Sequence, residues 1–204
     1  MSSGNSTGWY YDTVSGLVQI SDAQFPGNNS KTTTGTFAHM DGYAFIMDTE
    51  GSVWNSDLNT VTSWTALGYI SANAYPDKGI GVIRYKNQIV AFGRESVQFF
   101  FNAGNATGSP LARVDSATLK IGAINSDAIA QISDVLFWVG SGPQGGATVY
   151  MFDGTVSRIS TPEQDFQLLL AGPDNISLTT EKYYGRAFVV VKANATTYVY
   201  CMEE

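Results

Sequence analysis

The sequence predicts an all-β fold, a β-propeller of four-stranded antiparallel blades, with this chain supplying a partial propeller of about four blades from a larger one. Composition points this way. Of 204 residues only 14% are charged, whereas 21 are glycines and 13% are aromatic, a balance that favours short strands and tight turns over surface helices. The stretch 134–160 also holds two short apolar runs and a third, half-polar run, separated by a Gly-rich turn and by Asp153-Gly154, which is typical of a β-meander.

A repeat of this pattern identifies the blades. Turn residues that each precede an apolar strand recur at Asp41, Asn87, Asp134 and Gly185, with spacings of 46, 47 and 51 residues. Each of these strands is preceded by one candidate strand and followed by another, and the first three sets add a fourth. Four antiparallel strands at this period match a propeller blade.

We expect residues 1–8, rich in Ser, Gly, Asn and Thr, to form a disordered tail and residues 9–204 to form one propeller domain without an internal boundary. The opening segment resembles 152–160, so the chain is expected to begin in the middle of a blade. The expected blades are a partial one at 9–21, three at about 36–70, 80–115 and 127–160, and a partial one at 176–204.

The two partial blades hold five strands together, one more than the split blade that usually closes a ring, which favours part of a larger propeller. The segment Ser160–Leu170, with a proline and a glutamate near its start, is expected to give a turn or two of helix.

Few residues can support metal or nucleophilic chemistry. His39 and Cys201 are the single histidine and cysteine, which excludes a Cys/His zinc cluster. A catalytic serine or cysteine would need a base beside it, and His39 is the only histidine that could serve. His39, on a predicted inner strand, is expected to be a hydrogen-bonded structural residue, and Cys201 is expected to be buried. A formal net charge of -7 argues against tight nucleic-acid binding but allows weak or sliding contact with DNA. No signal peptide or membrane span is predicted.

Other local signals have simpler structural explanations. Paired carboxylates could hydrolyse glycosides near a propeller axis, but most of the candidate acids occupy turn sequences. These candidates are Asp41, Asp48, Glu50, Asp77, Asp134 and Asp153. The aromatic runs Phe99–Phe101 and Phe137–Trp138 could stack bases or sugars, but strand positions favour a role in the core between blades. The glycines at 140–146 do not open a helix, so a phosphate loop is not favoured. Five N-x-S/T sequons are attributed to turn composition. They begin at Asn5, Asn28, Asn105, Asn175 and Asn194.

An ordered series of short segments resembles one known family. The segments are Ala74–Lys78, Ala91–Gly93, Val97–Phe100, Asn102–Gly104, Leu111–Arg113, Ile121–Gly122, Leu136–Gly140, Val149–Tyr150 and Arg158–Ser160. In this order and spacing they resemble the packaged-DNA stabilisation proteins of short-tailed P22-like phages, which are tail hub or nozzle components. The resemblance covers about residues 9–200.

The resemblance implies a β-propeller that assembles with other copies into a sixfold ring beneath the portal and adaptor proteins. Such a ring extends the portal channel, retains the packaged double-stranded DNA and conducts it at ejection without reading its sequence. It implies no enzyme activity, no cofactor, and no catalytic, cofactor-binding or metal site. The protein would be made in the cytoplasm of the host bacterium and reside in the virion. A carbohydrate-active propeller, either a glycosidase or a lectin, is the alternative hypothesis.

Overall fold

The computed structural model describes residues 7–72, 74–75, 77–142 and 145–202. Strands dominate it, and every sheet is antiparallel and built from strands that are consecutive in the sequence. The chain divides into two compact units, residues 1–93 with 98–118 and residues 94–97 with 119–204. The predicted all-β fold with four-stranded antiparallel sheets is therefore confirmed, whereas the assignment of 9–204 to one domain stays a prediction.

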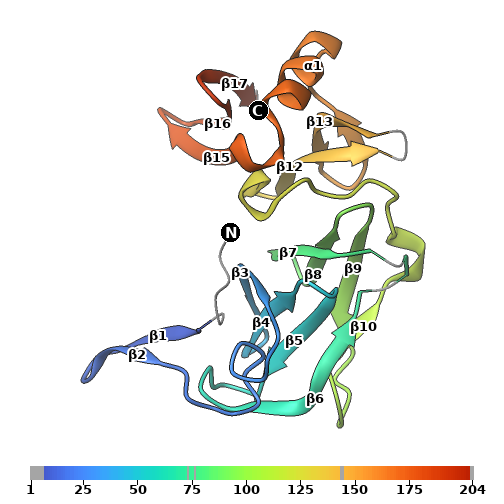
Figure 1. Ribbon diagram of the computed structural model, residues 1–204. Helices are drawn as coiled ribbons and strands as arrows, with labels where there is room; N and C mark the ends of the chain where they lie inside the picture. Colours follow the sequence, from blue (N-terminus) through green and yellow to red (C-terminus); the bar gives the residue numbers. More distant parts are fainter. Residues whose placement is uncertain (1–6, 73, 76, 143–144, 203–204) are drawn as a thin grey trace. The chain divides into compact units, whose positions relative to one another are not determined.

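The first unit contains one hairpin and two four-stranded sheets (Figure 1). The hairpin consists of β1 (Trp9–Asp12) and β2 (Gly16–Gln19). The first sheet consists of β3 (Thr33–Met40), β4 (Tyr43–Asp48), β5 (Ser52–Ser56) and β6 (Trp64–Ser71). The second consists of β7 (Gly79–Tyr85), β8 (Gln88–Gly93), β9 (Val97–Asn102) and β10 (Leu111–Arg113), and the 3-10 turn η1 (Asp115–Ala117) follows it.

The second unit contains a four-stranded and a three-stranded sheet with the one α-helix of the described residues. After η2 (Ser126–Ala128), the first of these sheets consists of β11 (Ile129–Ile132), β12 (Val135–Gly142), β13 (Gly145–Phe152) and β14 (Val156–Arg158). Then come α1 (Pro162–Ala171), η3 (Pro173–Asn175) and the last sheet, β15 (Ile176–Tyr183), β16 (Arg186–Ala193) and β17 (Thr196–Met202).

Two-residue turns explain why the repeat is visible in the sequence. The four repeat positions all lie between the first and second strands of a sheet, where only two residues separate the last paired positions. At Asp41-Gly42 and Tyr184-Gly185 both residues have positive φ, at 52° and 82° and at 48° and 77°. That is the backbone of a type I′ turn, whose twist matches that of the strands it joins.

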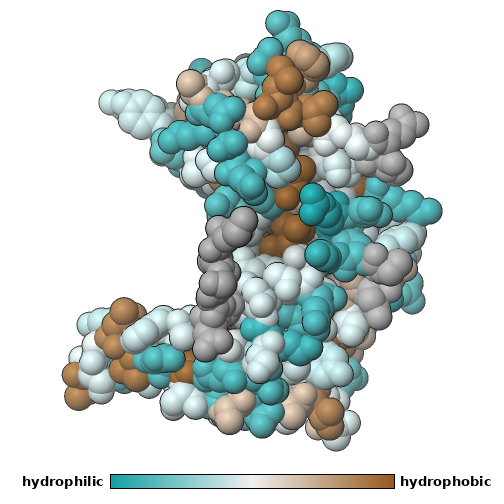
Figure 2. Space-filling view, in the orientation of Figure 1, coloured by the Kyte–Doolittle hydropathy of each residue, from teal (hydrophilic) through white to brown (hydrophobic). Residues whose placement is uncertain are grey.

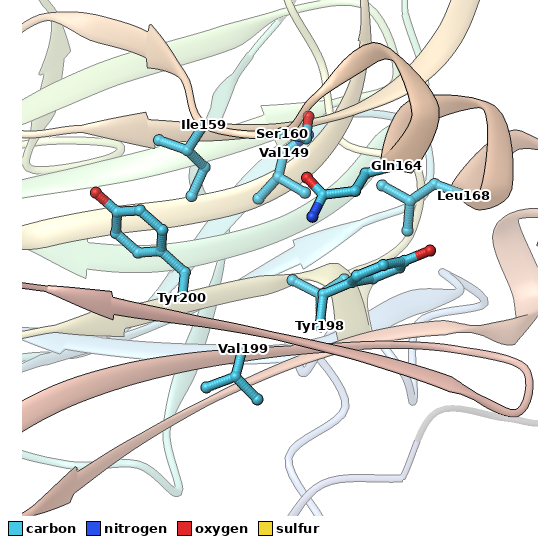
Figure 3. A pocket seen from close by; sticks show the side chains of 9 residues that line it. Val149, Ile159, Ser160, Gln164, Leu168, Tyr198, Val199 and Tyr200 are labelled. Atoms are coloured by element: carbon cyan, nitrogen blue, oxygen red, sulfur yellow. The ribbon is translucent and has the colours of Figure 1, made fainter.

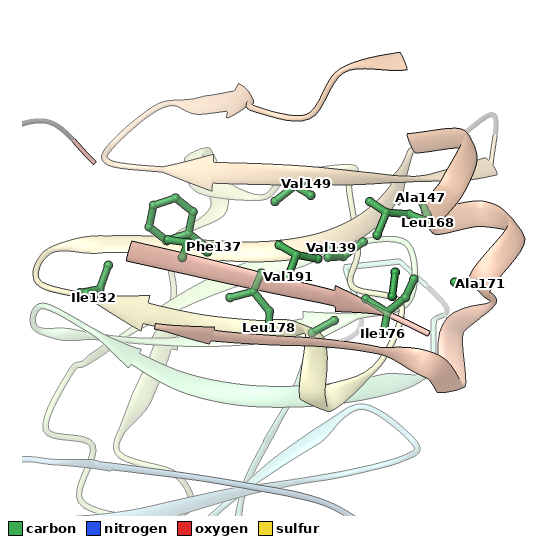
Figure 4. Close-up of a cluster of buried hydrophobic side chains, with 13 residues drawn as sticks. Ile132, Phe137, Val139, Ala147, Val149, Leu168, Ala171, Ile176, Leu178 and Val191 are labelled. Carbon is green, nitrogen blue, oxygen red and sulfur yellow. The ribbon is translucent and has the colours of Figure 1, made fainter. Parts of the chain in front are cut away.

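Each unit buries a core between its two sheets. In the first unit, buried residues of the first sheet such as Phe45 and Val53 pack with Ile89 and Phe100 of the second. In the second unit, Phe137 and Val139 of β12 pack with Val189 and Val191 of β16, and Leu168 of α1 closes one end (Figure 4). Burying one such side chain stabilises the fold by roughly 1.5–3 kcal/mol, so pairing of successive sheets through their faces is the main stabilising contact within each unit.

The helix α1 is longer than the predicted turn or two. Thr161 and Gln164 form a reciprocal capping box, and Pro162 occupies the first turn, where its missing N–H costs nothing. Asp165 then ties the helix to the sheet, because its carboxylate accepts from Thr148 Oγ1 at 2.7 Å and from Ser160 Oγ, and pairs with Arg158 Nη2 at 2.7 Å.

The expected disordered tail falls mainly on residues 1–6, which lie outside the described residues. Thr7 and Gly8 are described, and the Gly8 carbonyl accepts a hydrogen bond from the Ile20 N–H at 2.8 Å. At the base of the hairpin, Ile20 and Phe25 pack with Trp54 and Trp64 of the first sheet. This end of the predicted tail is therefore part of the fold.

Candidate functional site

The candidate acids are used mainly to build turns. Asp48 is fully buried, and its Oδ1 accepts from the N–H groups of Glu50 and Ser52 at 3.0 and 2.8 Å while Oδ2 accepts from Trp54 Nε1 at 2.8 Å. Glu50 pairs with Lys31 Nζ at 2.6 Å on the surface. Asp77 lies directly over Gly93, where a Cβ atom would come within 2.2 Å of its Oδ2. The surroundings of these three carboxylates are explained by contacts within the fold.

The other three acids are exposed at turns. Asp41 accepts from Asn102 Nδ2 at 2.9 Å, and Asp153 accepts from the main chain and hydroxyl of Thr155 at 3.2 Å. Asp134 is the second residue of the turn between β11 and β12. In the described part of the chain, no group of three or more His, Cys, Asp or Glu side chains could hold a metal ion.

The single histidine and cysteine differ from expectation in their surroundings. His39 is exposed on β3, and its main-chain carbonyl accepts a hydrogen bond from Arg84 Nη1 at 3.5 Å. Cys201 is half-buried rather than buried, because it lies on β17, the outermost strand of the last sheet. The prediction of a buried Cys201 was therefore wrong, since its strand has a neighbour on one side only.

The aromatic runs lie in the core with one exception. Phe99, Phe100, Phe137 and Trp138 are at most 2% exposed, whereas Phe101 is 43% exposed. The four buried rings cannot stack on a base or a sugar without unfolding of the sheet. The prediction that these runs lie in the core is confirmed for these four side chains, whereas Phe101 is the exposed member of its run.

The Gly-rich stretch 140–146 joins β12 to β13, and its positions 143–144 lie outside the described residues. Gly140 passes so close to Gly122 that a Cβ atom would come within 2.1 Å of the Gly122 carbonyl oxygen. Gly145 and Gly146 have φ of 78° and 104°, which only glycine adopts without strain. The described residues of the stretch belong to β12 and β13 and open no helix, so they do not form the junction of loop and helix that binds phosphate in a phosphate loop.

A small pocket of about 70 Å³ lies in the second unit between β13, residues 159–160 after β14, α1, β16 and β17 (Figure 3). Its walls are mainly apolar, with Val149, Leu168 and Tyr198 among them. Its central polar side chains serve the fold: Ser160 Oγ accepts from the Val149 N–H at 2.9 Å and donates to Asp165, and Gln164 completes the helix cap. The pocket holds no paired acid and base that could carry out catalysis.

Exposed apolar side chains are concentrated on the hairpin. Its outward face carries Trp9, Tyr11 and Leu17, which are 53%, 75% and 68% exposed, and Val14 at the turn is 93% exposed. The space-filling view shows hydrophobic colour gathered on this arm (Figure 2). At the base of the arm, an apolar groove of about 370 Å³ runs between the hairpin and the first sheet, lined by Tyr10, Phe37 and Ile46 among others.

This exposed apolar surface was not predicted from the sequence. The signal was present, since WYYD and GLVQ place apolar side chains at both odd and even positions of strands that belong to an incomplete blade. A second exposed apolar group, made of Phe166, Leu169 and Leu170, lies on α1. These three residues follow i, i+3, i+4 spacing and therefore share one helix face, a pattern that the predicted helix segment already contained.

Two charged side chains have shifted pKa values. The N–H groups of Ser15 and Val14 donate to Asp12 at 2.7 and 2.9 Å and lower the pKa of its carboxyl group. A hydrogen bond to Glu50 raises the pKa of Lys31. Asp12 thereby stabilises the turn between β1 and β2, and Lys31 pairs with Glu50. No helix in the described ranges is both long and apolar enough to cross a membrane.

Comparison with known proteins identifies the family. Two solved structures share 14% identity with the chain. The computationally designed Ika4 protein has a TM-score of 0.49 with 85% of this chain and 93% of that chain covered, and glutaminyl cyclase from Myxococcus xanthus has 0.36 with 81% and 71% covered. Both scores are too low to bear on fold or function. None of the curated proteins matches.

The family model described as "Bacteriophage P22 Gp10, beta-propeller" matches residues 1–203. The match spans nearly the entire sequence and agrees with the antiparallel sheets of four consecutive strands, which are the blades of a propeller. The chain therefore belongs to the β-propeller family of bacteriophage P22 Gp10, phage proteins that stabilise packaged DNA.

Proposed function

We propose that the chain is a hub or nozzle component of the tail of a short-tailed phage, and that it acts structurally rather than as an enzyme. In this proposal its sheets are successive blades of one propeller domain, residues 9–204. Copies form a sixfold ring that extends the portal channel, contacts the portal, the adaptor and other tail proteins, retains the packaged DNA and conducts it at ejection. The protein is made in the host cytoplasm and functions in the virion.

The observation that carries the proposal is the family match over residues 1–203. The use of polar groups in the structure supports it. Among the candidate acids, Asp48, Glu50, Asp41 and Asp153 have their carboxylates bound to turns or to neighbouring side chains of the same fold. Enzymes instead leave an acid and a base facing substrate in a cleft.

Net charge supports the part of the proposal that concerns DNA. Tight binding to duplex DNA needs several Lys or Arg side chains on phosphates, which release counterions. This chain has 11 Lys and Arg against 18 Asp and Glu, a net charge of -7. A channel lined by such subunits repels the DNA backbone and lets the duplex slide.

Electron microscopy of the purified chain tests the assembly, and the expected particles are rings with sixfold symmetry. Duplex DNA titrated into the same sample should bind weakly, with a dissociation constant above about 100 μM at physiological salt and a shallow salt dependence. Tight binding with a steep salt slope would rule out the passive channel. A persistent monomer that cleaves oligosaccharides would overturn the structural role and favour the glycosidase hypothesis.

A further inference from the structure

A polar pocket of about 430 Å³ lies in the first unit, where β5 and β6 meet the loop between β9 and β10. The residues that line it fall between positions 43 and 110, and all of them belong to this unit. The chain crosses into the second unit close to the start of β9, at residues 93–98 and again where Leu119 pairs with Val97. The pocket lies beyond the other end of β9, so it is built by the first unit alone and from the interior of the sequence.

An irregularity in the first sheet makes room for this pocket. The strand β6 pairs with β5 at Tyr69 and again at Trp64, and between these two points four residues of β6 lie opposite the single residue Asn55. The strand with the extra residues bends away from its partner, as at a β-bulge. Gly68 brings it back close to β5, because a Cβ atom there would lie 3.2 Å from the Asn55 carbonyl oxygen and 3.3 Å from Nδ2. The bulge therefore places the Asn55 amide in the wall of the pocket.

The side-chain donors around Asp57 are already used within the fold. Ser63 Oγ and Thr65 Oγ1 donate to the two carboxylate oxygens of Asp57 at 2.6 and 2.8 Å. Ser56 Oγ donates to the Asp57 carbonyl at 3.0 Å, and Asn55 Nδ2 donates to the Ser56 carbonyl at 3.1 Å. These groups have no further proton to offer, so this wall of the pocket presents acceptors to a ligand.

Two amide side chains leave their oxygens as acceptors. Asn55 is 5% exposed, and its Oδ1 has no hydrogen-bond partner among the described residues, which is a costly state for a buried amide oxygen. Turning the amide over would set its oxygen against the Ser56 carbonyl, so the orientation is fixed by that neighbour. Asn105 also uses its Nδ2 within the fold, because this group donates to the carbonyls of Ser109 and Leu111 at 3.0 and 3.3 Å. The acceptor excess therefore extends to both walls of the pocket.

The pocket also carries a negative charge that its own walls do not balance. Asp57 is half-buried, and the side chains that donate to it are neutral hydroxyls. No Lys, Arg or His is among the described residues that line the pocket. Two apolar side chains, Leu58 and Leu67, line it as well and are 55% and 70% exposed. A matching ligand is therefore positively charged, donates several hydrogen bonds and carries a short apolar chain.

We propose that the polar pocket binds a primary alkylammonium group, such as one end of a linear aliphatic diamine. An ammonium group has three donors and no acceptor, which fits walls that present acceptors. Its nitrogen pairs with the Asp57 carboxylate, and a small shift of the Asn55 side chain lets the shielded Oδ1 accept from the same nitrogen. The methylene chain packs on Leu58 and Leu67. A calcium ion would instead need about six to eight oxygen ligands at about 2.3–2.6 Å and would leave these apolar walls without a contact. This inference does not rest on the proposed tail function.

Titration of the full chain with 1,4-diaminobutane, followed by NMR, tests the site. We expect saturable shifts of the side-chain amide signals of Asn55 and Asn105 and of the Asp57 main-chain amide, with a dissociation constant of about 1 mM or below. Two matched ligands separate the contributions: 1,4-butanediol lacks the charge, and the fully N-methylated diamine keeps the charge without N–H donors. Each should bind at least about tenfold more weakly. Equal binding of either ligand, or displacement of the diamine by an equal concentration of calcium chloride, would overturn the proposal.

A pair of variants tests the role of the carboxylate. Asp57→Asn should weaken binding of 1,4-diaminobutane by at least about tenfold. Asp153→Asn is the matched control, because it removes the same charge from an exposed turn of the second unit, and it should bind the diamine as the unchanged chain does. Equal losses in the two variants would show that binding follows net charge and would refute the site. If Asp57→Asn does not fold, as judged by circular dichroism, the ligand series on the unchanged chain still decides. Neither result bears on the ring particles that test the proposed function.

Discussion

Asp48 is fully buried at the end of β4, where its carboxylate accepts two main-chain N–H groups of the following turn and the indole N–H of Trp54. Hydrogen bonds to a buried charged group are worth more than neutral ones, about 1.5–3 kcal/mol each. The side chain therefore fixes the turn that aligns β4 with β5. Removing its charge should disturb the first sheet directly.

Asp48→Asn is expected to lower the free energy of unfolding by about 2–4 kcal/mol, measured by urea denaturation. The amide oxygen can still accept from the Glu50 and Ser52 N–H groups, but the amide nitrogen would face the Trp54 N–H, so two donors would oppose each other. The matched control is Glu50→Gln in the same turn. Its ion pair with Lys31 is exposed, and its loss should cost less than about 0.5 kcal/mol. Equal effects of the two variants would contradict this account.

The sequence predicts that these acids lie in turns, but it does not predict which of them is buried. Asp48 and Glu50 lie two residues apart in one turn, yet one is fully buried and the other exposed. The difference arises because Trp54, six residues later, closes over Asp48 from the paired strand. The turn sequence itself does not show that a side chain of the next strand will cover Asp48. Residue type and turn context therefore could not distinguish a buried structural acid from a surface acid.

The hairpin β1–β2 has its own pH-dependent element. The Ser15 and Val14 N–H groups lower the pKa of Asp12 in the folded hairpin, so the ionised carboxylate favours the turn. This contribution is fully present above the ordinary aspartate pKa of about 3.9 and is lost as pH falls through the lowered folded value. The Val14 and Ser15 amide resonances should therefore shift with a midpoint below about 3.9 in an NMR titration.

Asp12→Asn provides the control for that titration. An asparagine oxygen can still accept from the two N–H groups but does not ionise in this range. The two amide resonances should then be insensitive to pH between about 6 and 2. A titration that persists in the variant would show that another group is responsible.

Strand and turn positions could be predicted well because their signals are local. The four repeat positions predicted from the sequence all lie in turns between the first and second strands of a sheet. The ends of β6 (Trp64–Ser71) were harder to predict. There the pairing with β5 shifts register between Trp54 and Ser56. A bulge of this kind lengthens one strand relative to its partner, and nothing in the local sequence of β6 signals it.

At the scale of the whole molecule, charge and apolar surface oppose each other during assembly. Copies with a net charge of -7 repel one another at low ionic strength, whereas exposed apolar side chains, such as Tyr11 and Leu17 of the hairpin and Phe166 of α1, favour contact. Salt shortens the range of the repulsion, from a Debye length of about 30 Å at 0.01 M to about 8 Å at 0.15 M. Apolar burial is not weakened by this change.

We therefore expect the oligomeric fraction to increase with sodium chloride between about 10 and 300 mM, measured by sedimentation velocity at fixed protein concentration. Binding to DNA should decrease over the same range, because counterion release weakens it. The opposite signs separate the two processes in one set of samples. Oligomers that dissociate as salt is added would indicate ion pairs at the interface and contradict an apolar contact.

The sequence could not predict which apolar faces stay uncovered. Strand periodicity places Trp9 and Tyr11, or Phe188 and Val190, on definite faces of their strands, but burial depends on what each face meets. The spacing of the repeat established the four-stranded sheets. The division into two compact units arises from contacts between distant strands, and these are not encoded in any single repeat.

One feature of the topology bears on how such a protein evolves. Every sheet uses strands that are consecutive in the chain, joined to the next sheet by one connection. One continuous stretch of the coding sequence therefore encodes one complete sheet. Duplication or loss of one whole repeat of about 45–50 residues changes the number of blades and leaves the strand connections of the other blades unchanged. Such changes would alter the size of this protein in steps of one blade.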